Sequence, residues 1–199
     1  IPRTDLMILA ADQANPQVVA LDLLAYAEQD PQGSLVVLTD RQRLAEQISH
    51  WVTTYCRDQG HSIHTEKAIA HYGLIGVVDD LLTCLDWVNQ FCPHTLMVAM
   101  ADPWPVVEKV QRAREIYIGQ TTPAILGDYW LGSLCLRYRA GDFRSASQLA
   151  LHCFLQPCQL LDYGATATPD WLPALVNGED VTAIQQRLQW TSGEPPRPS

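Results

Sequence analysis

The sequence has no long hydrophobic run and no concentration of positive charge, and each absence excludes a class of protein. No segment reaches the roughly 18 consecutive apolar residues that a membrane-spanning helix needs. Lys and Arg together number 13 against 22 Asp and Glu, so the formal net charge is -9. A surface that binds nucleic acid needs a concentrated basic patch. We therefore expect neither a membrane span nor a nucleic-acid partner.

Disulfide and secretion signals are also missing. The six cysteines show no C-x-x-C spacing, and no signal-peptide pattern precedes the first apolar segment. A chain of 199 residues can bury a core without disulfides, so we expect free, buried thiols in a soluble, cytoplasmic protein. The chain begins with Ile1, and we interpret it either as a processed product or as part of a longer gene product.

Strand-like and helix-like segments alternate along the chain. Short apolar runs typical of buried strands lie at residues 4–10, 35–38, 74–78, 95–100 and 115–119. Helices are predicted between them, with N-terminal signals at Asn15-Pro16, Asp40, Asp80 and Asp102-Pro103. This alternation predicts a doubly wound α/β fold, in which helices cover both faces of a mainly parallel sheet.

The pattern changes after Tyr129. Residues 171–176 and 181–190 predict a small helical C-terminal appendage, and the proline-rich tail that follows contains too few apolar residues to order itself. We therefore divide the chain into an α/β domain (1–140), a helical extension (141–190) and a disordered tail (191–199).

The loops where a doubly wound sheet usually binds ligands contain no nucleotide-binding motif. These loops follow the carboxyl ends of the strands. The first of them, residues 11–16, has no G-x-G-x-x-G, and the chain has no Walker-type phosphate loop, no G-x-S-x-G elbow and no H-E-x-x-H motif. The sequence therefore predicts no glycine-rich cradle for NAD or another nucleotide.

Two titratable residues are candidates for a site. His94 lies between a predicted helix and a predicted strand, and it would be a general base if a polar substrate reached it. Asp128 follows Gly127, and a loop carboxylate after a glycine can approach a ligand or a metal ion. Each residue also has a structural interpretation, with His94 as a half-buried histidine and Asp128 as a helix cap or turn carboxylate. The residues alone leave both interpretations open.

Three segments resemble motifs of the histidinol dehydrogenase family, in the same order and with the same spacing. Residues 14–28 (ANPQVVALDLLAYAE) resemble A-N-P-x-x-V-A-x-D-L-L-S-Q-A-E. Residues 89–96 (NQFCPHTL) resemble N-x-x-A-P-E-H-L, and residues 118–129 (IGQTTPAILGDY) resemble L-G-x-x-T-P-E-A-L-G-D-Y. The resemblance implies a Rossmann-like domain, zinc, and two successive NAD-dependent oxidations of histidinol to histidine. It also implies a dimer with shared active sites.

The positions to which the resemblance assigns chemistry depart from the family pattern. The family's Gln and His zinc ligands fall on Tyr26 and Gln29, and neither a neutral phenol nor a carboxamide is a good zinc donor. The family's catalytic Glu–His pair falls on His94 and Thr95, and Thr95 cannot transfer protons near neutral pH. Asp128 remains at the position of a family zinc ligand.

Other parts of the family's site are altered as well. A substrate-contacting Ser is replaced by Thr4, and the G-x-N-H-x-L-P-T segment falls on residues 132–138, which include Cys135. The C-terminal E-G-L-x-x-H segment, which supplies another zinc ligand, has no counterpart, and we expect the family's NAD-binding N-terminal portion to precede this chain. We therefore predict no catalytic residues, no bound NAD and no zinc, with Asp128 the one ligand that a metal would retain.

These observations favour a histidinol-dehydrogenase-like domain that has lost the family's activity. We expect it to act as a binding or structural component, either as a homodimer or with another protein. The alternative is a repurposed enzyme, or a binder of a metal or small molecule, that uses the family's old pocket. We define this vestigial pocket by six residues: Thr4, Tyr26, Gln29, His94, Asp128 and Cys135.

Overall fold

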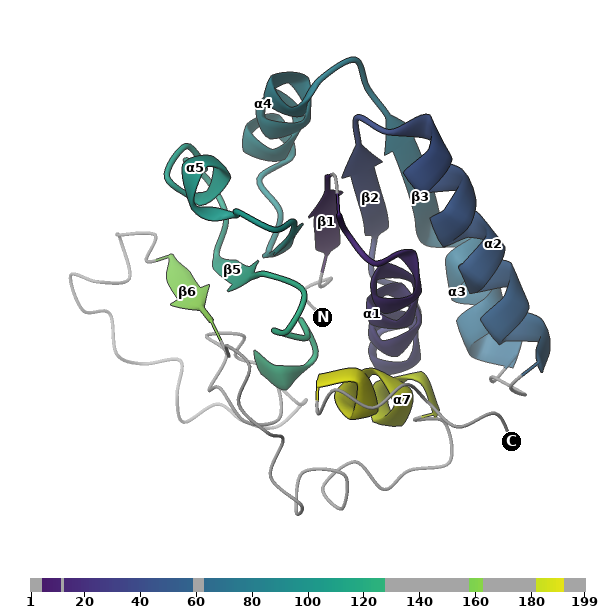
Figure 1. The fold of residues 1–199 in the computed structure, drawn as a ribbon. Coiled ribbons are helices and arrows are strands. Elements are labelled where there is room, and N and C mark those ends of the chain that lie inside the picture. The colour runs from purple at the N-terminus through teal and green to yellow at the C-terminus, as the bar shows by residue number, and fades with distance from the viewer. Residues whose placement is uncertain (1–4, 12, 59–62, 128–157, 163–181, 192–199) are drawn as a thin grey trace, which may run out of the picture.

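A parallel β-sheet forms the centre of the molecule (Figure 1). The computed structural model describes residues 5–11, 13–58, 63–127, 158–162 and 182–191. Within them, the sheet has the strand order β3-β2-β1-β4-β5-β6, and all neighbouring strands are parallel. The strands are β1 (Leu6–Ala10), β2 (Leu35–Thr39), β3 (Gly73–Val77), β4 (Thr95–Ala99), β5 (Glu115–Ile118) and β6 (Gln159–Leu161). This is the strand order of the Rossmann fold, so the predicted fold class is confirmed.

Helices cover both faces of this sheet (Figure 1). One face packs against α1 (Pro16–Gln29), α2 (Gln42–Asp58), α3 (Ile63–Tyr72) and α7 (Thr182–Thr191). The other face packs against α4 (Leu81–Phe91) and α5 (Trp104–Val107). Successive strand side chains point to opposite faces, so Ile8 belongs to the first core layer and Leu9 to the second. None of the described helices is both long and apolar enough to cross a bilayer.

The predicted helix starts are confirmed at α1 and α4. Asn15 Oδ1 accepts a hydrogen bond from the backbone N–H of Gln17 (3.0 Å). Asp80 Oδ1 accepts one from the backbone N–H of Thr83 (2.7 Å), and this bond lowers the pKa of the Asp80 carboxyl. These contacts pair amides that no carbonyl of the same helix can reach. These side-chain caps define where both helices begin, next to the sheet.

The start of α2 and the length of α5 differ from the prediction. α2 begins at Gln42, two residues after the predicted cap, because Thr39 Oγ1 accepts the N–H of Arg41 (3.1 Å) and shapes the turn before the helix. The helix predicted after Asp102 is a single turn, and Pro103 at its N-cap position makes no side-chain capping bond. The capping contact that begins α1 and α4 is therefore missing at α5.

α1 is buried on all sides, although its sequence suggested one buried stripe. Every residue from Val18 to Ala27 is buried. The additional cover comes from α7 and from residues 124–126, which belong to the same core layer. A helix that is apolar around its whole circumference is typically buried, and α1 follows this rule with Asp22 as an exception in its middle.

The C-terminal part adds both a strand and a helix to the fold. β6, which the sequence did not predict, extends the sheet beside β5, and its three residues are too few to show a period of two. The helix predicted over residues 181–190 is α7. The predicted helix at residues 171–176 and the tail after Thr191 lie outside the described residues, and the division of the chain at residue 140 stays a prediction.

Candidate functional site

Two residues of the vestigial pocket, Tyr26 and His94, meet Thr95 at the amino edge of the sheet. Tyr26 lies in the last turn of α1, Thr95 is the first residue of β4, and His94 precedes it. After β1 the chain returns along α1, so the last turn of this helix lies near the edge where the strands begin (Figure 1). The three residues therefore lie opposite the strand carboxyl ends, where doubly wound folds usually bind ligands.

A buried hydrogen bond joins Tyr26 and Thr95, at positions to which the family resemblance assigns a zinc ligand and a catalytic residue. The Tyr26 hydroxyl lies 2.8 Å from Thr95 Oγ1, and the two residues are only 3% and 1% exposed. His94 Nδ1 is 3.3 Å from the same Thr95 oxygen. Buried hydroxyls need a hydrogen-bond partner, and here each of the two provides a partner for the other without a metal or a substrate.

A buried carboxylate beside Thr95 was not predicted. Glu115, the first residue of β5, is paired in register with Thr95, so both side chains point to the same face of the sheet. It is 2% exposed, and the Tyr117 hydroxyl donates to its Oε2 (3.0 Å). Glu115 was missed because nothing in the sequence shows that the start of this strand is covered. We call Tyr26, His94, Thr95, Glu115 and Tyr117 the polar cluster.

The other members of the vestigial pocket are placed less completely. Gln29 is the last residue of α1, three positions after Tyr26, and it is half-buried. Thr4, Asp128 and Cys135 lie outside the described residues. The structure therefore brings Tyr26 and His94 together with Thr95, and it leaves the grouping of the whole pocket a prediction.

A second buried polar group, also not predicted, anchors α7 to α1. Asp22 Oδ2 accepts a hydrogen bond from Arg187 Nε at 2.6 Å, and both side chains are at most 1% exposed. Asp22 Oδ1 accepts from the Ala124 N–H (3.4 Å), while Arg187 Nη2 donates to the Gln120 carbonyl (2.8 Å). Burial raises the pKa of the Asp22 carboxyl, and this effect exceeds the lowering by Arg187. The sequence signal was a carboxylate within an apolar helix, which calls for a buried partner.

Glu28 strengthens the same helix contact. Its carboxylate accepts hydrogen bonds from the backbone N–H groups of Ala183 (3.1 Å) and Ile184 (3.3 Å), in the first turn of α7. A carboxylate at this end complements the unpaired amides and the helix dipole. Asp22 and Glu28 both belong to the motif at residues 14–28, so two acidic residues of this motif hold the C-terminal helix across α1 (Figure 1).

The described part of the motif at residues 118–129 is packed against the core. Thr122 Oγ1 donates to the carbonyl of Ile118 (2.8 Å), and Thr122 is fully buried. Residues 124–126 lie in the same core layer as α1. Up to Gly127, therefore, the contacts of this motif are those of a structural segment packed against α1.

The described residues do not fit the zinc ion that the resemblance implies. The Tyr26 hydroxyl is paired with Thr95, and Gln29 offers only a carboxamide. Within the part of the chain that the structure describes, no group of three or more His, Cys, Asp or Glu side chains could hold a metal ion. A stable zinc site takes four ligands, usually from His, Cys and carboxylates, so we derive no reaction step through zinc.

The first strand-to-helix turn also does not fit the NAD that the resemblance implies. In dinucleotide-binding folds, the pyrophosphate lies at a glycine-rich turn and at the exposed amides of the following helix. Here the Gln120 side chain occupies this place: its Oε1 accepts the N–H of Asn15, and its Nε2 donates to the Gln13 carbonyl (2.9 Å). A protein side chain therefore binds where a phosphate would.

The expectation of buried free thiols holds only in part. Cys56, Cys84, Cys92 and Cys158 are free, but Cys92 and Cys158 are exposed. Burial raises the pKa of the Cys84 thiol to about 11. A thiol with this pKa is protonated at neutral pH and is a poor nucleophile, so Cys84 is a core residue.

Comparison with known proteins decides the family. The family model described as histidinol dehydrogenase matches residues 3–181. This chain belongs to the histidinol dehydrogenase family. The family resemblance seen in the three sequence motifs is therefore confirmed.

Relatives and a solved structure agree with this membership. A histidinol dehydrogenase homolog from Synechocystis sp. is 56% identical over 188 residues, covering 94% of this chain and 46% of the relative. A histidinol dehydrogenase from Synechococcus sp. is 38% identical over 186 residues, covering 94% of this chain and 42% of the relative. The chain thus spans less than half the length of these curated relatives. The crystal structure of histidinol dehydrogenase from Elizabethkingia anophelis matches with a TM-score of 0.58 at 22% identity, over 64% of this chain and 29% of that one, and shows the shared fold.

Proposed function

We propose that this chain is a histidinol-dehydrogenase-like domain without the family's catalytic activity, which acts as a binding or structural component. The observation that carries the proposal is the 2.8 Å hydrogen bond between Tyr26 and Thr95. It joins two positions at which the family resemblance implies a zinc ligand and a catalytic imidazole. Neither hydroxyl can replace the group that is missing from its position.

Proton transfer is the second argument for lost activity. A general acid or base works best when its pKa is close to the operating pH, and a threonine hydroxyl does not titrate in this range. His94 has an imidazole, but it lies at the position of the family's glutamate. Loss of one member of a catalytic set already costs several powers of ten in rate, and here both members of the pair are replaced.

The contacts around α1 support a structural role. Asp22 and Glu28, from one family motif, bind Arg187 and the first turn of α7. These residues join the first helix of the chain to the last one that the structure describes. The family's acidic motif residues therefore serve the scaffold in this chain.

We extend the proposal to assembly, either with a second copy of the chain or with another protein. Light scattering on the purified chain tests the homodimer, with an expected mass of twice 22.2 kDa. A mass of one chain at high protein concentration would rule out the homodimer and leave assembly with another protein, which co-purification tests.

The activity part of the proposal is tested by turnover. Purified chain, incubated with histidinol, NAD and zinc, should produce no NADH above the rate of a blank. The Synechococcus relative, which is named histidinol dehydrogenase, serves as the positive control. Reduction of NAD that depends on both histidinol and the chain would refute the proposal.

A transplant separates the effect of the altered residues from that of chain length. The Synechococcus relative would receive Tyr, Gln, His and Thr at the positions aligned with Tyr26, Gln29, His94 and Thr95. We expect its rate to fall by roughly a thousandfold or more, since a catalytic pair and two ligands are removed together. Retained activity would show that these four residues do not account for inactivity.

A further inference from the structure

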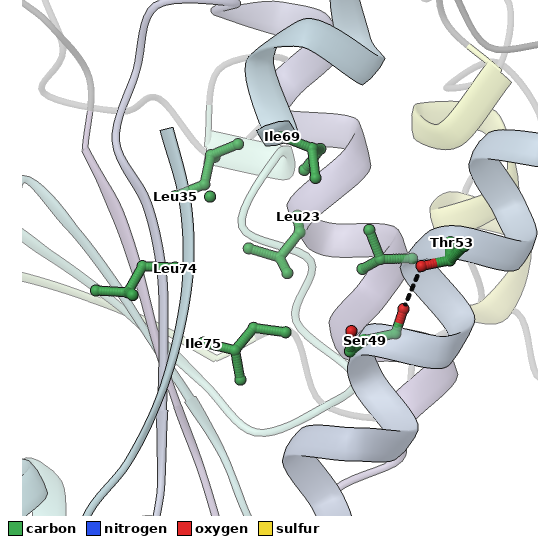
Figure 2. A pocket seen from close by; sticks show the side chains of 9 residues that line it. Leu23, Leu35, Ser49, Thr53, Ile69, Leu74 and Ile75 are labelled. Atoms are coloured by element: carbon green, nitrogen blue, oxygen red, sulfur yellow. Dashed lines mark hydrogen bonds between the residues drawn. The ribbon is translucent and has the colours of Figure 1, made fainter. Parts of the chain in front are cut away.

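A pocket lies between α1, α2, α3 and the first residues of β2 and β3 (Figure 2). Its volume is about 170 Å³. The inner wall is formed by Leu23 of α1, Leu35 of β2, Val52 of α2, Ile69 of α3 and Ile75 of β3. Figure 2 shows Leu23, Leu35, Ile69 and Ile75 around the space, with Ser49 and Thr53 of α2 at one side.

The chemistry of the wall favours an uncharged apolar occupant. None of the residues that line the pocket is charged. Thr53 Oγ1 donates to the Ser49 carbonyl (2.9 Å), so its hydrogen is used within the helix, and the Ser49 hydroxyl is the polar side-chain group left at the mouth. A water molecule is held well only by two to four polar partners, and the inner wall provides apolar side chains. Water there is therefore easily displaced by an apolar group.

A close approach of backbone borders the pocket. A Cβ atom at Gly73 would clash with the carbonyl oxygen of Ile69, so α3 and β3 meet here only because position 73 has no side chain. This junction leaves Ile69 and Ile75 as walls of the space and not as its filling. A cavity of about 150 Å³ with such a lining accepts benzene, so a pocket of about 170 Å³ suits a molecule of about six to eight nonhydrogen atoms.

We propose that this pocket binds a small uncharged molecule with one six-membered ring and at most one hydroxyl group. The ring lies between Leu23 and Ile75, and the hydroxyl, where present, lies at the mouth near Ser49. The site shares no residue with the polar cluster, so the proposal goes beyond the proposed function and does not depend on it.

A titration of the full chain tests the proposal. Methyl resonances of the chain would be followed by NMR during the addition of benzene, phenol and benzoate. Benzene and phenol should shift the methyl groups of Leu23, Val52, Ile69 and Ile75 in a saturable way, and phenol should bind at least as tightly as benzene. Benzoate should cause no such shift, because its carboxylate would lose its hydration. Absence of a saturable shift with benzene would overturn the proposal, as would equal binding of benzoate.

Variants of α2 locate the site. Val52→Phe fills the inner wall, and Ser49→Leu closes the mouth from an exposed helix position, so the second variant folds even if the first does not. Each should weaken benzene binding by roughly tenfold or more, a range known for steric changes in hydrophobic pockets. The control is Gln47→Leu, which adds the same side chain at an exposed position of α2 outside the lining. Unchanged binding in Ser49→Leu, or equal weakening in Gln47→Leu, would overturn the proposal.

Discussion

The polar cluster and the pocket beside Leu23 both border α1, and they differ in chemistry and in free space. In the polar cluster, the Tyr26 and Thr95 hydroxyls and the Glu115 carboxylate are buried and hydrogen-bonded to other polar side chains, with the Tyr26–Thr95 distance at 2.8 Å. In the pocket, apolar side chains surround about 170 Å³ of space. The resemblance assigns family chemistry to positions in the first region, whereas the second region provides the space for the proposed ligand.

This difference shows how the two regions respond to change. A buried polar group is costly when its partner is removed, since its desolvation is no longer compensated. An apolar wall responds to volume, and it tolerates an added methylene where space exists. Variants in the two regions should therefore have effects of different size and sign.

The largest effect is expected at the anchor between α1 and α7. Asp22→Asn leaves the Arg187 guanidinium buried without its carboxylate, and breaking a buried pair in this way costs about 3–5 kcal/mol. Urea unfolding, followed by circular dichroism, measures the loss. The double variant Asp22→Leu/Arg187→Leu should recover most of it, because no uncompensated charge remains. A single variant as stable as the unmodified chain would contradict this account of the anchor.

The next effect concerns the hydrogen bond of the polar cluster. Tyr26→Phe removes one hydroxyl from a buried pair and should cost about 1–3 kcal/mol. The matched change, Thr95→Val, removes the other hydroxyl. The loss of unfolding free energy in the double variant should be smaller than the sum of the two single-variant losses. The difference should be about 0.5–3 kcal/mol, as expected for groups in contact. Strictly additive unfolding free energies would show that the hydroxyls do not interact.

A smaller effect of opposite sign is expected in the pocket. Val52→Ile places one methylene next to free space and should stabilise the fold by up to about 0.8 kcal/mol. The control is Val37→Ile in β2, where the side chain is fully buried and an added methylene should destabilise by about 1 kcal/mol or more. Equal destabilisation by both changes, measured by urea unfolding, would mean that the pocket has no usable space.

The smallest effect is the pH dependence of the α4 cap. The folded-state pKa of Asp80 is lowered by its bond from Thr83, so its charge contributes stability above the unfolded-state pKa of about 4. This contribution is lost as the pH falls through the folded-state pKa. Asp80→Asn keeps a capping oxygen but has no charge. The difference in unfolding free energy between the two proteins should therefore shrink in acid, and a difference that grows in acid would contradict the assignment.

Much of the fold could be predicted from the sequence. Five of the described strands follow from short apolar runs, and Asn15 and Asp80 begin their helices as predicted. The length of α5 and the position of β6 could not be predicted, because a single turn and a three-residue strand leave no periodic signal. The burial of α1 on every side depends on α7, which lies far along the chain.

The candidate site was only partly predictable. The motifs identified Tyr26, His94 and Thr95 as altered positions, but spacing does not show that the first and third are hydrogen-bonded. Glu115 was missed because its place beside Thr95 depends on strand register, and Arg187 because its partner Asp22 comes from a distant segment. The burial of a charged residue depends on tertiary packing, so it cannot be predicted from the neighbouring residues in the sequence.

Zinc content tests the proposed loss of the metal site, because we propose that hydroxyl and amide groups stand where the family has its ligands. The purified chain would be dialysed with excess zinc at neutral pH, freed of unbound metal and measured by elemental analysis. We predict no stoichiometric zinc and no zinc-dependent shift in thermal unfolding. One zinc ion per chain that is lost in both Gln29→Ala and Asp128→Ala would contradict the account, since it would show that the family's metal site still works.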